Sequence, residues 1–170
     1  MKFIIDTDPG TDDAVAILIA LAHFSDEEFL AITTVAGNVT VDIGTKNALR
    51  LLEHTNRNNI PVYKGEAKPL YRELTTAEWV HGSDGLNGVD FPNPSKNEES
   101  SDAVSYITNL LKNSDEKIIR RRIKDLMLLF SDPLIHRGHT LSQSDTHCCY
   151  SKLGVLFFHL VQQGCRDPCS

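Results

Sequence analysis

Residues 1–13 read MKFIIDTDPGTDD, and this stretch decides the fold. The apolar run at residues 1–5 is typical of a buried strand, and the Asp, Pro, Gly and Thr residues after it predict a loop. A helix is expected to begin near Asp12, because apolar residues then recur at helical spacing. Its predicted buried stripe is Ala14, Val15, Ile17, Leu18 and Leu21.

The same alternation of strand and helix continues along the chain. Residues 29–35 form a second buried-type strand, and Gly37 and Asn38 follow it in a turn. We expect a helix at 43–53, a short strand at 61–63, a long loop at 68–97 with one turn of helix, a helix at 101–113, and a strand beginning at 117–118. Strands that alternate with helices indicate an α/β fold with an open, mostly parallel sheet and flanking helices.

Charge and hydropathy exclude several classes of partner. The net charge is −6, and the sequence has no basic cluster in its first hundred residues, so neither nucleic acid nor an anionic membrane is expected as a partner. There is also no apolar run of the roughly 20 residues that span a bilayer. We therefore expect a cytoplasmic protein whose four cysteines are free thiols.

The composition changes at Ile118. The chain carries a net charge of −9 up to this residue and +3 after it, and all four cysteines follow it. We predict a folded unit at 1–118 and a divergent tail at 119–170, and we hypothesise a reading-frame shift, a retained intron or an alternative last exon. The alternative is a genuine structural element, with the apolar residues 153–161 docking on the sheet.

Four carboxylates follow the first strand within eight residues: Asp6, Asp8, Asp12 and Asp13. The carboxyl ends of strands are where open α/β sheets bind their ligands. Negative charges this close repel one another unless a cation lies among them, and a hard divalent metal prefers oxygen ligands. The alternative is that Asp12 and Asp13 only cap the helix and complement its dipole.

Two separated motifs resemble those of one enzyme family. DTDPGTDDAVAIL at 6–18, followed by AITTVAGNVT at 31–40, is similar to the amino-terminal signature of the inosine/uridine-preferring nucleoside hydrolases. The similarity continues through Lys46-Asn47-Ala48, Pro61-Val62 and His81-Gly82, and it ends near Ile118. The resemblance implies the amino-terminal part of a nucleoside hydrolase domain, with the rest of the family sequence missing.

The resemblance also implies a mechanism and a set of site residues. Family members use Ca²⁺ to bind the ribose hydroxyls and a water, and they hydrolyse ribonucleosides to ribose and free base. By position, Asp8 would be the general base and a Ca²⁺ ligand, and Asp13 would be a second, bidentate ligand. Asp6 and Asp12 would hold the loop and contact the ribose.

Two further residues have open roles. Asn38 would hydrogen-bond the sugar by resemblance, and its alternative is an ordinary turn residue after Gly37. His81 would face the base or its leaving-group side, and its alternative is an exposed loop histidine. Trp79 is a lid or a packing residue.

The resemblance leaves the activity of this chain open. The later family segments that complete the Ca²⁺ and sugar ligands have no counterpart after Ile118. One alternative is therefore a catalytically inactive fragment that binds or oligomerises, and a homo-oligomer is a possible state. The other is a haloacid-dehalogenase-like phosphatase, in which Asp6 would be the nucleophile and Asp8 the acid/base.

Overall fold

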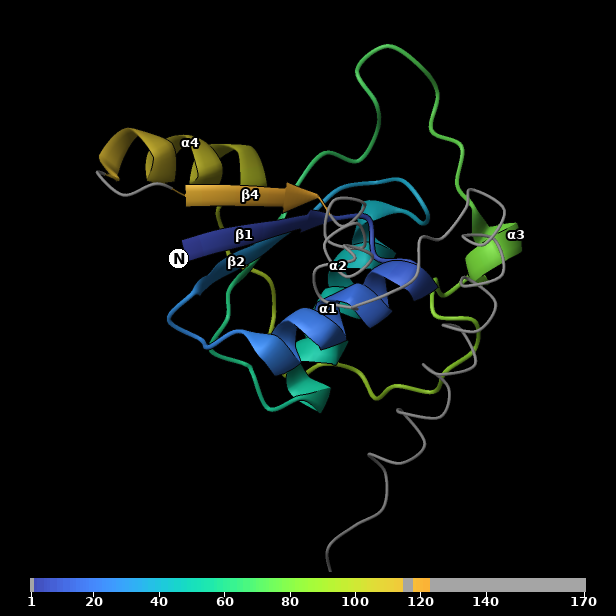
Figure 1. Ribbon diagram of the computed structural model, residues 1–170. Coiled ribbons are helices and arrows are strands. Elements are labelled where there is room, and N and C mark those ends of the chain that lie inside the picture. Colours follow the sequence, from blue (N-terminus) through green and yellow to red (C-terminus); the bar gives the residue numbers. More distant parts are fainter. Residues whose placement is uncertain (1, 115–117, 123–170) are drawn as a thin grey trace, which may run out of the picture. The chain divides into compact units, whose positions relative to one another are not determined.

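Strands and helices alternate along most of the described chain, and two helices in succession precede the last strand. A computed structural model describes residues 2–114 and 118–122, and all of them lie in one unit, Met1–Met127 (Figure 1). The elements are β1 (Lys2–Thr7), α1 (Thr11–His23), β2 (Phe29–Thr34), α2 (Val41–His54), β3 (Val62–Lys64), α3 (Glu78–His81), α4 (Ala103–Asn113) and β4 (Ile118–Arg122). The predictions for residues 123–170, including the apolar segment 153–161, lie outside the described residues.

Within the described residues the sheet has four strands in the order β3-β2-β1-β4, and each neighbouring pair is parallel. Its central strand β1 is apolar on both faces, and Phe3, Ile4 and Ile5 are almost completely buried. A strand buried on both faces needs a layer of helix on each side. The predicted open, parallel α/β fold is confirmed.

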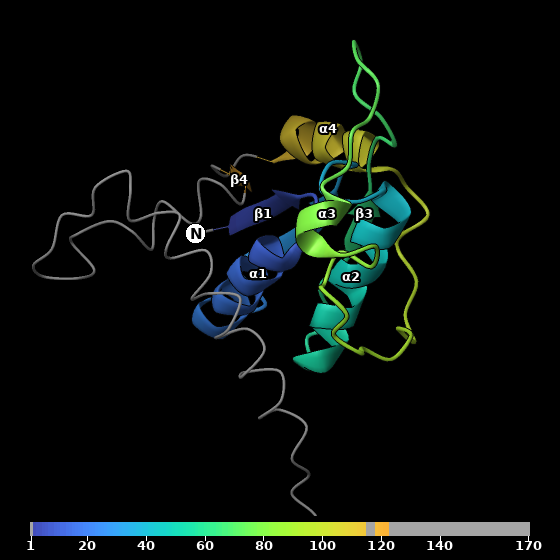
Figure 2. The same ribbon diagram turned by 90° about the vertical axis from the view of Figure 1, so that its right-hand side faces the viewer.

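Helices cover both faces of this sheet. Figures 1 and 2 show α1 and α2 on one face and α4 on the other. The chain winds outward from β1 to β3, and then α4 crosses back so that β4 pairs with the free side of β1. Since crossovers in parallel sheets are right-handed, a reversal of direction puts the connecting helix on the opposite face. The strand order therefore reverses between β1 and β4, and the loop after β1 lies at that reversal.

The predicted helices are found with small shifts at their ends. Helix α1 begins at Thr11, α2 is longer than expected at both ends, and the single turn α3 lies in the long loop as expected. Helix α4 begins at Ala103, because Asp102 is its N-cap and accepts a hydrogen bond from the Ser105 amide at 2.8 Å. Leu18 was expected in the buried stripe of α1, but it is only half-buried.

Strand β4 extends further than the apolar pattern predicts. The apolar residues end at Ile119, yet the strand continues through three arginines and pairs with β1 as far as Asp6↔Arg122. Sheet ladders are formed by backbone groups, and an outer strand tolerates charged residues better than a central one.

Among the described residues, no helix is long and apolar enough to cross a membrane.

Candidate active site

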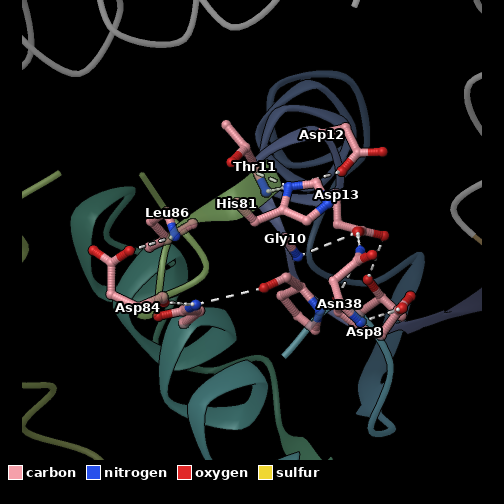
Figure 3. Close-up of polar contacts among 12 residues, drawn as sticks. Asp8, Gly10, Thr11, Asp12, Asp13, Asn38, His81, Asp84 and Leu86 are labelled. Carbon is pink, nitrogen blue, oxygen red and sulfur yellow. Dashed lines mark hydrogen bonds and ion pairs between the residues drawn. The ribbon is translucent and has the colours of Figure 1, made fainter. Parts of the chain in front are cut away.

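Three loops at the carboxyl ends of the strands bring the predicted residues together. The first is the Asp loop, which we define as residues 8–13 and which follows β1. The second contains Gly37 and Asn38 and follows β2. The third carries His81, at the end of α3, against the start of α1 (Figure 3). Because this edge of the sheet also holds the strand-order reversal, it is the expected ligand-binding position of an open α/β fold.

Asp13 is the most buried carboxylate of the Asp loop. Its Oδ1 accepts a hydrogen bond from Thr7 Oγ1 at 3.0 Å. Its Oδ2 accepts from the Gly10 amide at 3.2 Å and from Asn38 Nδ2 at 2.8 Å. The bond to Gly10, the N-cap residue of α1, shows that Asp13 does cap the helix as the alternative proposed. The bonds to Thr7 and Asn38 go beyond capping, because they tie this carboxylate to two strand ends.

The environment of Asp13 disfavours its negative charge. Only 5% of the residue is exposed, and burial is the main cause that raises its pKa from 3.8 to about 8. The neighbouring charges of Asp12 and Asp8 raise the pKa further, whereas the bonds from Gly10 and Thr7 lower it. A buried carboxylate with such a raised pKa, in the first turn of the helix that follows β1, is a candidate functional group.

Asn38 connects Asp8 to Asp13. Its backbone amide donates to Asp8 Oδ2 at 2.9 Å, and its side-chain Nδ2 donates to the Asp8 carbonyl at 3.1 Å. With the bond to Asp13, both N–H groups of the side-chain amide are used, so Oδ1 is the atom that can accept a bond from a ligand. Position 37, just before Asn38, must be a glycine, because a Cβ there would lie 2.1 Å from Asp8 Oδ2.

His81 is held against the start of α1. Its Nδ1 accepts a hydrogen bond from the Thr11 amide at 3.2 Å, and the side chain packs over Gly10, where a Cβ would lie 3.0 Å from the ring. Since a backbone amide can only donate, Nδ1 is unprotonated in this arrangement and Nε2 carries the hydrogen of the neutral ring. Only 8% of His81 is exposed, so it is not an ordinary exposed loop residue.

The two remaining predicted residues lie on either side of this centre. Asp6 is the penultimate residue of β1, and its Oδ1 accepts from Thr33 Oγ1 at 2.8 Å. Asp12 Oδ1 is buried without a hydrogen-bond donor and lies 3.8 Å from His81 Nδ1. The structure thus brings Asp8, Asp12, Asp13, Asn38 and His81 together, while Asp6 is directed to the neighbouring strand.

Sequence reasoning assigned no role to three residues that shape this site, although one of them, Asn47, belongs to the family-like segment Lys46-Asn47-Ala48. Thr7 and Thr11 contact Asp13 and His81, and Asn47 of α2 bonds to the Pro9 carbonyl at 3.4 Å. The only available signal for Thr7 was its place between two aspartates. The signal for Asn47 was an amide at a buried helix position, which needs hydrogen-bond partners.

The donor set of the site is made of oxygens. In the described part of the chain, no three acidic, histidine or cysteine side chains converge closely enough to enclose a metal ion. Asp8 and Asp13 do converge, since both accept hydrogen bonds from Asn38. The charge of Asp8 raises the pKa of Asp13, and two carboxylates placed in this way match the charge and ligand preference of a hard divalent cation.

Comparison with known proteins gives the same family from sequence and from structure. The chain is 47% identical to the pyrimidine-specific ribonucleoside hydrolase RihA of Shewanella sp. (strain MR-7), over 68% of this chain and 36% of that protein. It is similar to a plant nucleoside hydrolase, PpNRh1, with a TM-score of 0.64 and 38% identity over 71% of this chain and 38% of that one. The purine-preferring ribonucleoside hydrolase from Gardnerella vaginalis gives a TM-score of 0.66 and 26% identity over 79% and 45%.

The similarity is confined to part of each relative. The chain spans between a third and a half of the length of these proteins. The matched part contains all the site residues described above, and family membership excludes the phosphatase alternative. The model of the inosine-uridine preferring nucleoside hydrolases matches residues 3–121, and the chain belongs to that family.

Proposed function

We propose that this chain supplies the Asp-loop half of a Ca²⁺-dependent ribonucleoside hydrolase site, which cleaves the N-glycosidic bond to release ribose and free base. The observation that supports this most directly is the convergence of Asp8 and Asp13 on Asn38 at the strand-order reversal. Membership of the nucleoside hydrolase family supports the reaction class.

Asp8 and Asp13 would hold the Ca²⁺ ion. Asp13 has a pKa raised to about 8 by burial and by its acidic neighbours, and a cation beside it would offset that repulsion. When bound, Ca²⁺ supplies positive charge that acidifies a coordinated water and attracts hydroxyl oxygens of the sugar. The remaining ligands of a complete site would come from outside the described residues.

Asp8 would act as the general base. A water oxygen would form a bond to the anomeric carbon while the bond to the nucleobase nitrogen breaks, and the Asp8 carboxylate would take the proton of that water. The nucleobase would leave with the bonding electron pair and take up a proton at that nitrogen. The Asn38 amide fixes Oδ2 of Asp8, so the carboxylate is oriented before substrate arrives. Positive charge develops on the ribose ring during this step, and the cluster of carboxylates stabilises it.

Asn38, Asp12, Asp6 and His81 would position the substrate. Asn38 Oδ1 would accept a bond from a ribose hydroxyl, because both N–H groups of its amide are already bonded. Asp12 would also accept a bond from a ribose hydroxyl, through Oδ1, which has no hydrogen-bond donor. Asp6 would hold the Asp loop in place from β1. His81 would face the base and donate from Nε2, because Nδ1 is bonded to Thr11.

The proposed substrate is a ribonucleoside whose base is either a pyrimidine or a purine. Relatives named for pyrimidine and for purine nucleosides both match this chain. A cytoplasmic location and a homo-oligomer stay predictions. The second candidate function is a binding or oligomerisation module without catalysis.

The test is Ca²⁺-dependent release of ribose. The purified 170-residue chain is stripped of metal with EDTA, Ca²⁺ is added back, and ribose is measured with uridine and with inosine. We expect turnover that falls at least about a hundredfold in Asp8→Ala, since a general base contributes 10²–10⁴-fold. The matched control is Asp42→Ala, which removes an exposed carboxylate of α2 that pairs with Lys64.

Each outcome assigns the function. Turnover that Asp8→Ala abolishes and Asp42→Ala preserves supports the proposal. Equal turnover in both variants overturns the role of Asp8. A folded chain that binds Ca²⁺ by calorimetry without any turnover overturns the hydrolase proposal and supports the binding module.

A further inference from the structure

Asn47 is a completely buried amide in α2, with 0% of its surface exposed. An amide in such a place is unfavourable unless its donors and acceptor are paired. Its Oδ1 accepts from Arg50 Nη1 at 3.3 Å, within the same helix. Its two donor bonds leave the helix, and their partners lie in two different loops of the candidate site.

These two bonds join the Asp loop to the segment that follows His81. Asn47 Nδ2 donates to the Pro9 carbonyl at 3.4 Å and to the Asp84 carbonyl at 2.8 Å. Pro9 and Asp84 are far apart in sequence, and a single side chain bonds to both. Helix α2 therefore fixes the distance between the two loops through the side chain of Asn47.

The atoms around the Asn47 amide are closely packed. Gly85 has φ = +76°, and a Cβ there would lie 2.9 Å from Asn47 Nδ2 and 3.2 Å from the Pro9 carbonyl oxygen. The segment that carries Gly85 is itself closed, because the Asn87 amide donates to the His81 carbonyl at 2.8 Å. A bond that fixes Asp84 thus fixes the short loop that returns to His81.

We propose that Asn47 is a positioning residue of the active site, which sets the place of His81 by bonding the Pro9 and Asp84 carbonyls at the same time. It acts through the loops, since it touches neither the predicted base nor the predicted metal ligands. Holding the 82–88 loop against Pro9 keeps His81 Nδ1 at the Thr11 amide. The link to catalysis rests on the proposed function, whereas the link to His81 rests on these contacts alone.

The chemistry explains why an amide is needed at this position. Two carbonyl oxygens face the side chain, so it must present two N–H groups, and only an amide of this length does so. A carboxylate of the same shape has no donor and puts negative charge against both oxygens. Asn47→Asp is therefore the sharpest substitution, because it keeps the volume and reverses the polarity.

The matched control is Thr45→Val, in the same helix. Thr45 is also buried, and its hydroxyl bonds to Thr34 Oγ1 and to the Val41 carbonyl, both at 2.7 Å. Neither partner belongs to the two loops that Asn47 joins. The two variants remove buried hydrogen bonds of α2, but only one of them disturbs the predicted link to His81.

Two readouts follow the position of His81 without requiring turnover. The first is the ¹⁵N signal of His81 Nδ1 in the full chain, assigned by its disappearance in His81→Gln. The second is the fluorescence anisotropy of Trp79, the only tryptophan, which lies two residues before His81 in α3. In Asn47→Asp we expect the bonded Nδ1 signal to move to the position of an unbonded nitrogen and the anisotropy to fall. Thr45→Val leaves both unchanged.

A third readout separates positioning from simple destabilisation. If the chain turns over, Asn47→Asp should lower kcat about tenfold or more, since a misplaced group costs about this much, while KM stays within about threefold. A folded Asn47→Asp variant with the wild-type His81 signal and anisotropy overturns the proposal, as does Thr45→Val if it gives the same changes. Absence of turnover in every variant counts against the proposed function alone.

A second variant tests the link from the other side. Gly85→Ala places a methyl group against Asn47 Nδ2 while leaving the α2 helix intact. We expect the same movement of the His81 signal, smaller in extent. A shift in Gly85→Ala supports the proposal even where Asn47→Asp does not fold, and an unchanged signal in folded Gly85→Ala overturns it.

Discussion

The two ends of the sheet are built on opposite principles. At the amino ends of the strands, the ring of Phe3 packs against Phe24 and Phe29 with centroids 4.7 and 4.6 Å apart. Arg57 completes this end by donating to the Leu21 carbonyl at 2.6 Å and the Phe24 carbonyl at 3.1 Å. At the carboxyl ends, the Asp loop gathers negative charge, and one buried oxygen there has no donor.

The amino ends of the strands therefore contribute to stability, whereas the carboxyl ends carry the candidate site. Apolar burial and satisfied carbonyls at the amino end lower the free energy of the folded state. Clustered carboxylates at the carboxyl end raise it, which is expected only where a ligand later offsets the repulsion. Removing an apolar side chain at the amino end should therefore lower the free energy of unfolding, whereas removing a negative charge from the Asp loop of the metal-free protein should raise it.

The largest effect is expected at the amino end, for Phe3→Ala. Phe3 is 2% exposed and contacts two other rings, so its loss leaves a cavity that the neighbours fill only in part. We expect the free energy of unfolding to fall by about 3–5 kcal/mol, measured by urea denaturation. Tyr71→Ala is the control, because Tyr71 is 98% exposed and should change stability by less than about 0.5 kcal/mol. Equal losses in both variants would mean that this end is not the stabilising one.

An intermediate effect is expected at the carboxyl end, for Gly37→Ala. The added Cβ would lie 2.1 Å from Asp8 Oδ2, so the carboxylate must rotate away. We expect a loss of about 1–3 kcal/mol in stability and a fall of about tenfold or more in Ca²⁺ affinity, measured by calorimetry.

Gly88→Ala is the matched control for this loss of affinity. Gly88 has φ = +79°, so the substitution strains the backbone, but no atom lies within 4 Å of the added Cβ. It should lower stability by about 1 kcal/mol and leave Ca²⁺ affinity unchanged. Unchanged affinity in Gly37→Ala would contradict the assignment of Asp8 as a Ca²⁺ ligand.

The sequence predicted the elements of the fold and the edge of the sheet at which the Asp loop lies, because both depend on local patterns. Buried runs such as 29–35 indicate parallel strands, and carboxylates directly after a strand must lie at its carboxyl end. The hydrogen bond from Thr11 to His81 could not be predicted from the sequence, since it joins residues 70 positions apart across a long loop. The start of β4 near Ile118 was predicted, but its end was not, because backbone pairing with β1 continues where the apolar pattern stops.

The smallest effect, and the one of opposite sign, is expected for Asp13→Asn in metal-free protein. An asparagine can satisfy the same three neighbours, since its oxygen accepts from Gly10 and Asn38 while its nitrogen donates to the Thr7 hydroxyl. The substitution removes one of three clustered charges. We expect the variant to be more stable than the wild type by about 1 kcal/mol at pH 9, after allowance for relaxation around the buried charge.

The sign of this effect depends on pH. Asp13 has a pKa of about 8 in the folded chain and near 3.8 when unfolded, so between these values the folded state holds a proton that the unfolded state has released. The stability of the metal-free wild type therefore falls as the pH rises through about 8, and that of Asp13→Asn does not follow it. Saturating Ca²⁺ should reverse the order, because the ion stabilises only a chain that binds it. A variant less stable than the wild type at pH 9 without metal would mean that its three hydrogen bonds stabilise the Asp13 carboxylate more than burial and repulsion destabilise it.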